Sequence, residues 1–259
     1  MSSDTRGVLY SQASVVTRDA TRTETNYYAR SMAVGTNSIG MKPLSWISLP
    51  PTSPGQRIGL LGGSFDPAHA GHRHISLEAL ARLELDQVWW LVSPGNPLKN
   101  HDRLGALNQR ITDAKAVAHH PRIKVTGFEA ELGTSFTAET LDFLCGRVRG
   151  VHFVWLMGAD NLASFDRWRA WRGIMQLMPV AVFDRPGWRY RALGSRAASA
   201  FAAVRVPASE SRRLPRFAAP AWTFLSIRLS DLSSTALRSP RDEVGLARQF
   251  TPHHIQPAG

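Results

Sequence analysis

The chain has 259 residues, enough for one large domain or two small ones, and its 43% hydrophobic content is typical of a globular protein with a core. The formal charge of +11 favours anionic partners such as nucleotides, nucleic acids or acidic membranes. A single cysteine, Cys145, excludes an internal disulfide and a cysteine-based metal site, and no apolar run approaches the roughly 18 residues of a membrane span. We therefore expect a protein of the reducing cytoplasm with no membrane partner.

The first 55 residues differ in composition from the rest of the chain. They are rich in Ser, Thr and Arg, lack sustained apolar periodicity and contain no secretory signal core. We expect residues 1–55 to be a mostly disordered extension that ends in a Pro- and Gly-rich linker at 49–55. An alternative is that translation starts at Met32 or Met41. The functional domain is expected at 56–250.

After the linker, short apolar runs alternate with segments of helical spacing. Strands are predicted at 57–62, 87–93, 122–128, 151–158, 179–183 and 222–228, and helices at 72–85, 103–120 and 137–148. The runs are almost continuously apolar, which is typical of parallel strands covered on both faces. The alternation predicts an α/β fold, a Rossmann-like doubly wound parallel sheet of five to six strands flanked by helices. In such sheets ligands bind at the carboxyl ends of the strands, where the strand order reverses.

The segment "GGSFDPAHAGH" lies at the end of the first predicted strand. Gly62 and Gly63 leave room for a phosphate chain beside the backbone, and the following helix offers free N–H groups to an anion. His69 and His72 are three residues apart, so both can face one ligand and donate to phosphoryl oxygens. The alternative is that one histidine caps the helix and the other is a core residue.

Two further segments are candidate phosphate sites. In "LSSTALR", three helix-capping residues precede an arginine one turn later, so that hydroxyls, N–H groups and a guanidinium gather on one face: Ser233, Ser234, Thr235 and Arg238. An ordinary capped surface helix is the alternative. Lys99, after "GNP" at the end of the second strand, is either a phosphate contact or a solvated lysine.

These motifs resemble those of the nucleotidylyltransferase superfamily over residues 57–240. The segments "LVSPGNPLK", "TSFTAETL" and "GADNLASFDRWRAW" are similar to segments of nicotinate-nucleotide adenylyltransferases. His69 argues against the related phosphopantetheine adenylyltransferases, which typically carry threonine there. The Gly158–Asp160–Trp168 segment disfavours cytidylyltransferases and flavin adenylyltransferases. Ser64 for threonine and Leu232 for isoleucine are small departures from the usual motifs.

The resemblance implies transfer of the adenylyl group of ATP to nicotinate mononucleotide, which gives deamido-NAD and pyrophosphate. It implies catalytic roles for His69, His72 and Arg238. The implied ATP-binding residues are Gly62, Gly63, Ser64, Phe65, His69, His72, Gly158, Asp160, Ser233, Ser234, Thr235 and Arg238, and the implied acceptor-binding residues are Lys99, Phe136, Thr137 and Trp168. Mg²⁺ is expected to arrive with ATP and to have no ligand among the protein side chains. For Trp168 core packing is the alternative, because Phe165, Trp168 and Trp171 fall at helical spacing.

Three other functions stay open on the sequence. The acceptor can be nicotinamide mononucleotide or another phosphorylated compound, with the chemistry unchanged. A basic nucleic-acid-binding protein fits the charge but is disfavoured, because no recognised RNA motif or helix-turn-helix signature is found. An inactive nucleotide sensor is disfavoured by the intact His69, His72 and Arg238. The sequence makes no prediction about the oligomeric state.

Overall fold

A computed structural model describes residues 47–95 and 104–227. The predictions for residues 1–46, for Lys99 and for the motif at 232–238 lie outside the described residues. Near the start of the described part, Ile47 and Leu49 pack against the core, and the N–H of Gly55 donates to the carbonyl of Gly150 at 2.6 Å. The domain boundary at residue 55 stays a prediction.

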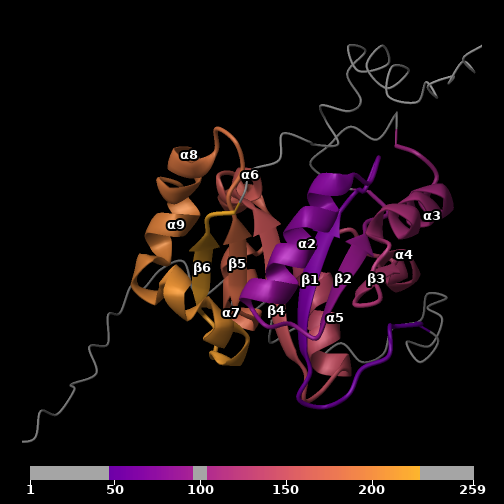
Figure 1. Cartoon of the computed structure of the whole chain (residues 1–259), viewed down its shortest axis with the longest axis horizontal. Helices are drawn as coiled ribbons and strands as arrows, with labels where there is room; N and C mark the ends of the chain where they lie inside the picture. Colours follow the sequence, from indigo (N-terminus) through magenta and orange to yellow (C-terminus); the bar gives the residue numbers. More distant parts are fainter. Residues whose placement is uncertain (1–46, 96–103, 228–259) are drawn as a thin grey trace, which may run out of the picture. The chain divides into compact units, whose positions relative to one another are not determined.

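Six parallel strands form one sheet in the order β3-β2-β1-β4-β5-β6 (Figure 1). Their bounds are β1 (Arg57–Gly63), β2 (Gln87–Val92), β3 (Ile123–Thr126), β4 (His152–Gly158), β5 (Val180–Phe183) and β6 (Trp222–Leu225). The chain runs outward from β1 to β3, returns to β4 beside β1, and runs outward again to β6. The predicted doubly wound α/β sheet and its six strands are therefore confirmed, and the strand order reverses between β1 and β4.

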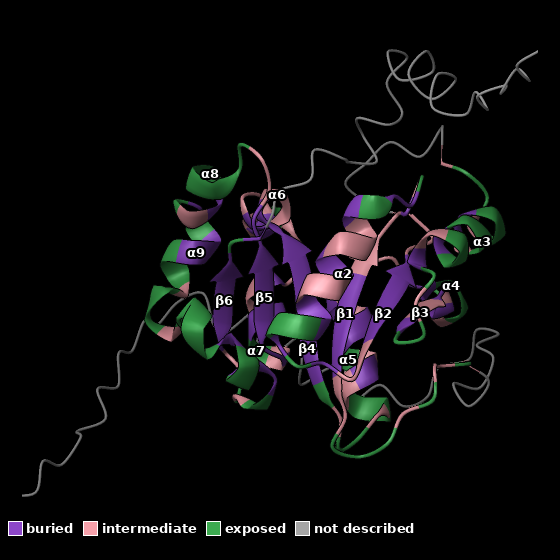
Figure 2. Cartoon of the chain, in the orientation of Figure 1, coloured by how far each residue is buried: buried purple, intermediate pink, exposed green. Residues whose placement is uncertain are grey.

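Helices cover both faces of the sheet, and the strands between them are buried (Figure 2). The helices are α2 (Ala70–Arg82), α3 (Leu107–Ala118), α4 (Phe128–Leu132), α5 (Thr137–Arg147), α6 (Ala159–Leu162), α7 (Trp171–Leu177), α8 (Arg189–Leu193) and α9 (Arg196–Ala200), with 3₁₀ turns η2 (Phe165–Arg167), η3 (Ala202–Val204) and η4 (Ala208–Arg216). One core cluster joins the sheet to α2, α3 and η4, and the other joins it to α5, α7 and α9. The three predicted helices correspond to α2, α3 and α5.

Side chains alternate between the two core clusters along each strand, as the strand period requires. On β2, Trp89 belongs to the cluster on the α5 face and Trp90 to the cluster on the α2 face. Both indoles are buried, and each N–H has a partner: Trp89 Nε1 donates to Gln87 at 2.9 Å and Trp90 Nε1 to Ser76 at 2.8 Å. Each such ring contributes several kcal/mol of apolar burial, on the order of 25 cal/mol per Å².

Several predicted bounds differ from the observed ones by one to four residues, and two local differences have a clear physical cause. The third strand ends at Thr126 rather than at 128, because the Thr126 hydroxyl accepts the N–H of Phe128 at 3.4 Å and the short helix α4 begins there. The segment from Phe165 to Trp171 is not a continuous helix. Trp168 is extended and Ala170 has a left-handed φ of 52°, so η2 and α7 are separate.

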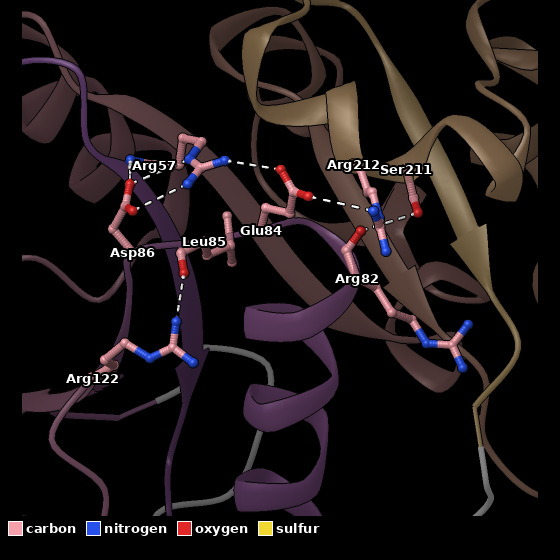
Figure 3. A network of polar contacts seen from close by, with 8 residues as sticks. All are labelled: Arg57, Arg82, Glu84, Leu85, Asp86, Arg122, Ser211 and Arg212. Atoms are coloured by element: carbon pink, nitrogen blue, oxygen red, sulfur yellow. Dashed lines mark hydrogen bonds and ion pairs between the residues drawn. The ribbon is translucent and has the colours of Figure 1, made fainter.

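A network of ionic and polar contacts ties the amino ends of β1, β2 and β3 to neighbouring loops (Figure 3). Arg57 pairs with Asp86 at 3.1 Å and with Glu84 at 3.3 Å, and the bond from Arg57 holds the pKa of Asp86 below its usual range. Arg122 donates to the carbonyl of Leu85 at 3.3 Å. These residues lie at the opposite end of the strands from the glycine motif, so they fasten the sheet and leave its carboxyl end to the site.

Candidate active site

The site is built where β1 and β4 end side by side. Gly62 and Gly63 close β1, Gly158 closes β4, and the two strands are paired in register. The loop after β1 leads to the histidines, and the turn after β4 leads to Asp160. Both motifs therefore meet at the point where the strand order reverses, which is the usual ligand crevice of this architecture.

Glycine is required at positions 62 and 158 because neighbouring side chains leave no room for a Cβ atom. A Cβ on Gly62 would lie 2.5 Å from the ring of Trp155, so glycine is needed there for close packing as well as for any ligand. A Cβ on Gly158 would lie 2.3 Å from Asp160 Oδ1 and 2.9 Å from Arg185 Cδ. Glycine at the end of β4 is thus what allows Asp160 and Arg185 to approach each other.

His69 and His72 form a reciprocal cap on α2. His69 Nδ1 accepts the N–H of Gly71 at 3.1 Å, and His72 Nδ1 accepts the N–H of His69 at 3.2 Å. The helix begins at Ala70, before the predicted start at 72, because His69 is its N-cap. The alternative that a histidine caps the helix is thus confirmed for His69. Both rings, however, use only Nδ1 in the cap. Each neutral ring then carries its proton on Nε2, and the cap does not use that N–H group.

Both imidazoles are neutral at pH 7. Burial, and then the positive charge of Arg185, lower the pKa of His69 to about 4. Burial, and then the charges of His69 and Arg185, lower the pKa of His72 to about 3. The His72 ring also packs on Phe65, with centroids 4.6 Å apart. The pair can therefore donate hydrogen bonds but is poorly suited to act as an acid with an imidazolium proton.

Asp160 and Arg185 form an ion pair beside the histidines. Arg185 Nη1 lies 3.5 Å from Asp160 Oδ2, while Asp160 Oδ1 is buried and has no hydrogen-bond partner among the described residues. A buried carboxylate oxygen without a donor is costly unless a ligand supplies one. Sequence reasoning missed Arg185. The signal was available, since Arg185 follows the predicted strand at 179–183 as the other motifs follow theirs.

In the loop after β1, the side chain of Phe65 is turned into the core. The Phe65 ring is fully buried, stacks on Trp90 at 4.9 Å, and has a left-handed φ of 47°. The Ser64 carbonyl accepts a bond from Arg110 at 2.6 Å. Any contact of Phe65 with a nucleotide is therefore limited to its main chain.

Three predicted acceptor residues, Phe136, Thr137 and Trp168, lie toward the face of the sheet that α5 and α7 cover. Trp168 is half-buried, and its ring makes T-shaped contacts with Phe165 and Trp155, at centroid distances of 5.3 Å and 6.5 Å. Because Trp155 also packs on Gly62, Trp168 is one side chain away from the glycine motif. The core-packing reading is thus partly correct, but part of the indole stays accessible.

Phe136 and Thr137 join this region through Arg169. Phe136 is the N-cap of α5 and Thr137 its first residue, and both are half-buried. The Arg169 guanidinium lies 4.5 Å from the centre of the Phe136 ring and 3.2 Å from Glu139. The structure thereby brings the 134–140 segment and the Trp168 segment together, as one acceptor site requires.

A hollow of about 410 Å³ at the other end of the strands does not belong to this site. It is lined by the end of α5, the segment that leads into the start of β4, the residues between α7 and β5, and part of the segment before β6, including Cys145, His152 and Phe217. Burial, and then the charge of Asp142, raise the pKa of the Cys145 thiol to about 11, so it is not a thiolate nucleophile at neutral pH. The predicted site residues that fall within the described ranges lie instead at the carboxyl ends of the strands.

Within residues 47–95 and 104–227, no group of three or more His, Cys, Asp or Glu side chains is placed to hold a metal ion. In the same ranges no helix is long and apolar enough to cross a membrane. The predicted phosphate contacts Lys99, Ser233, Ser234, Thr235 and Arg238 lie outside the described residues.

Comparison with solved structures agrees with the fold. A nicotinic acid mononucleotide adenylyltransferase of Plasmodium falciparum, complexed with NaAD, is similar with a TM-score of 0.56 and 14% identity over 75% of this chain and 89% of that one. A second structure of that enzyme, complexed with APC, has a TM-score of 0.53 over 71% of this chain and 82% of that one, again at 14% identity. At this identity the likeness concerns the fold alone.

Comparison with curated sequences gives the family. The chain is 56% identical over 183 residues to a probable nicotinate-nucleotide adenylyltransferase of Methylorubrum extorquens, covering 71% of this chain and 99% of the relative. It is 57% identical over 182 residues to a protein of the same description from Cereibacter sphaeroides, covering 70% and 96%. The cytidylyltransferase-like family model matches residues 60–239. The chain therefore belongs to the cytidylyltransferase-like family and, within it, to the nicotinate-nucleotide adenylyltransferases.

Proposed function

We propose that the protein transfers the adenylyl group of ATP to nicotinate mononucleotide, releasing pyrophosphate and forming deamido-NAD. The observation that carries this proposal is the pair of neutral histidines, His69 and His72, whose Nδ1 atoms cap α2 while their Nε2–H groups stay available at a glycine-rich strand end. The names of relatives at 56–57% identity support the same activity. The reaction contributes to NAD synthesis and, in a chain with one cysteine, suits a reducing cytoplasm.

On the ATP side, the residues divide by the part of the nucleotide they meet. The main-chain N–H groups around Gly63–Phe65, at the positive end of the α2 dipole, receive the phosphates. Asp160 Oδ1, which has no described partner, accepts a ribose hydroxyl, and Arg185 faces the phosphates beside the histidines. The motif of Ser233, Ser234, Thr235 and Arg238 holds the β- and γ-phosphates, as the family resemblance implies.

For this reaction the protein has to align the two substrates and stabilise the charge that develops on the transferred phosphoryl group. An oxygen of the acceptor's 5′-phosphate attacks the α-phosphorus of ATP, the bond from that phosphorus to the bridging α–β oxygen breaks, and pyrophosphate leaves with the electron pair. No general base is needed, because the attacking phosphate is already ionised. The Nε2–H donors of His69 and His72 stabilise the charge that develops on the phosphoryl oxygens, and neutral rings do this without titrating near pH 7.

Mg²⁺ fits this site as a companion of ATP. Among the described site residues, Asp160 supplies one carboxylate oxygen without a partner, whereas a protein cage would need several. The ion, when bound, neutralises charge on the phosphates, and its ligands would be phosphate oxygens, water and at most Asp160. The protein's own residues do the orienting.

On the acceptor side, Trp168 stacks on the pyridine ring, Phe136 and Thr137 meet the ring carboxylate, and Lys99 meets a phosphate. An accessible indole face suits a cationic pyridine ring. Nicotinamide mononucleotide is the competing acceptor, because it differs only in an amide for the carboxylate.

The test is an acceptor panel with ATP and Mg²⁺ that follows pyrophosphate release. Nicotinate mononucleotide should react much faster than the amide or phosphopantetheine. Equal rates, or a preference for the amide, would overturn the acceptor assignment and leave adenylyl transfer standing. No release with any acceptor would overturn the activity.

A further inference from the structure

Arg110, on α3, is a buried arginine whose guanidinium donates to four backbone carbonyl oxygens. Its side chain reaches Gly105 at 2.7 Å, Ser64 at 2.6 Å, Ser93 at 2.8 Å and Pro94 at 3.4 Å. Arg110 is only 3% exposed. Burial lowers the pKa of the guanidinium, and the charge of Asp66 partly opposes that shift. A cation is costly to bury, so four aligned acceptors at one residue indicate a structural requirement at this place.

Three of the four carbonyls come from the loops that build the site, and the fourth, that of Gly105, lies just before α3. Ser64 directly follows β1 and its two glycines, while Ser93 and Pro94 directly follow β2. The N–H of Ser93 also donates to the carbonyl of Gly63 at 2.9 Å, so the two loops are in contact where Arg110 binds them. One guanidinium nitrogen, Nη1, bonds both Ser64 and Ser93. Arg110 therefore fixes the separation of the loop after β1 from the loop after β2.

The backbone at the first loop needs such support. Phe65 adopts a left-handed φ of 47°, which is unfavourable for a bulky residue. The carbonyl that Arg110 binds belongs to the peptide between Ser64 and Phe65, so the bond holds the strained residue from its amino side. The buried Phe65 ring, stacked on Trp90, holds it through its side chain. The conformation that turns the chain toward His69 is thus determined from two sides.

We propose that Arg110 is a positioning residue for adenylyl transfer, which holds the ATP-binding loop after β1 and the loop after β2 in the alignment that the in-line reaction requires. This inference rests on the proposed function, in which the first loop binds ATP and the second leads to the acceptor site. Arg110 itself touches neither substrate. Each loop can still receive its own ligand without Arg110, but the two ligands are no longer held in register.

The kinetic test compares Arg110→Lys and Arg110→Met with the wild type and with Arg122→Lys. Lysine keeps the charge but has one nitrogen, so it cannot bond four carbonyls in a plane. Arg122 is the matched control, because its guanidinium also donates to a backbone carbonyl, that of Leu85, at the amino end of the sheet (Figure 3). We expect both Arg110 variants to lose on the order of 10²-fold in kcat, with KM for ATP and for the acceptor changed by less than about threefold.

Two measurements separate positioning from general stability. Calorimetric binding of deamido-NAD, which spans both loops, should weaken more than about tenfold in Arg110→Lys, while a nonhydrolysable ATP analogue binds almost as in the wild type. The calorimetric stoichiometry reports the folded fraction. Amide hydrogen exchange should rise in residues 64–66, Ser93 and Gly95 of the Arg110 variants and stay unchanged in β4 and β5. Arg122→Lys should change none of these.

The outcomes are distinct. Wild-type kcat per folded Arg110→Lys molecule, or exchange that rises evenly over the sheet, would overturn the positioning role. Equal weakening of deamido-NAD and of the ATP analogue would do the same. A wild-type protein that releases no pyrophosphate would overturn the proposed function instead, and the exchange measurement would then decide alone whether Arg110 holds the two loops.

Discussion

The imidazole rings of His69 and His72 lie 3.9 Å apart between centroids, and each Nδ1 accepts a backbone N–H in the first turn of α2. The two side chains therefore have a structural role, which uses Nδ1, and a proposed chemical role, which uses Nε2. Because the two roles use different atoms of each ring, suitable substitutions can separate them.

His69→Asn and His72→Gln should keep the cap and lose the chemistry. Both replacements retain a side-chain acceptor for the helix N–H groups but lack the ring Nε2–H. We expect turnover to fall on the order of 10²–10³-fold, the usual loss for a transition-state donor, with little change in melting temperature. His69→Ala and His72→Ala should lose similar activity and also about 1 kcal/mol of stability.

His74→Gln is the control for these variants, since His74 lies on the same helix and has no proposed part in the reaction. Steady-state kinetics and thermal unfolding, measured on all five variants, check the separation. Near wild-type turnover in His69→Asn would mean that His69 is a cap only.

Acidification should destabilise the protein through the same two rings. Their folded-state pKa values are about 4 and about 3, below the ordinary 6.5, so the unfolded state binds more protons between about pH 6.5 and those lower values. The free energy of unfolding should fall as the pH drops from 6.5 toward 4, by up to about 1.4 kcal/mol per pH unit for each histidine. Above pH 6.5 neither ring makes the free energy of unfolding depend on pH.

Urea unfolding at pH 7.5, 5.5 and 4.5 measures this effect. The double variant His69→Asn, His72→Gln should show a shallower pH dependence than the wild type. Identical slopes in the two proteins would contradict the buried, neutral state of the rings.

Arg185→Gln should weaken ATP binding. The variant removes a cation that faces the proposed phosphate site and leaves Asp160 without its ion-pair partner. We expect KM for ATP to rise on the order of tenfold, the cost of one charge-assisted hydrogen bond, and KM for the acceptor to stay near normal. The pKa values of His69 and His72 should rise only in part, because burial is the larger cause of their depression.

Arg196→Gln removes an exposed arginine from the same arginine-rich part of the chain, residues 185–216, and serves as the control. Substrate titrations on both variants distinguish a local effect from a loss of net positive charge. An equal rise in KM for both variants would show that Arg185 acts only through that net charge.

The fold was predictable because its signals are local. Near-continuous apolar runs separated by helical segments indicated each of the six strands, and their parallel pairing follows from the crossovers. The position of the glycine motif at a strand end was predictable for the same reason. The close packing of Trp155 on Gly62 was not, because it joins residues 93 positions apart on different strands.

The sequence did not predict the residues that support the site, because their contacts also join distant parts of the chain. Arg110 is 46 positions from Ser64 in the sequence, and only the folded sheet brings the ends of β1 and β2 to its guanidinium. The spacing of His69 and His72 predicted a shared face but could not show that Nδ1 is used for the cap. Helical spacing over Phe165–Trp171 was misleading, because Ala170 turns left-handed and leaves Trp168 extended at the sheet end.

Trp168→Ala should raise KM for the acceptor and leave KM for ATP near normal. The expected loss is roughly 1–3 kcal/mol, the range for a base stacked on an aromatic side chain, and Trp168→Phe should recover part of it. Trp171→Phe is the control, since Trp171 is buried and should change stability rather than KM. If Trp168→Ala lowers only the melting temperature, the indole is a core residue and the acceptor assignment loses its main support.

Glu129→Gln should stabilise the protein at alkaline pH. Glu129 is buried beside Thr140, whose hydroxyl donates to its carboxyl at 2.9 Å, and burial raises the pKa of Glu129 to about 7 from the ordinary 4.5. The folded state thus holds a proton that the unfolded state releases, so stability from this group is full below pH 4.5 and is lost as the pH rises to 7. Glutamine keeps an acceptor for Thr140 and removes the cost of the buried charge, so the variant should gain roughly 1–3 kcal/mol at pH 8 and little at pH 4.5. Urea unfolding at the two pH values, with the exposed Glu131→Gln as the matched control, measures the difference. A gain of equal size at both pH values would mean that the carboxyl does not titrate as its burial requires.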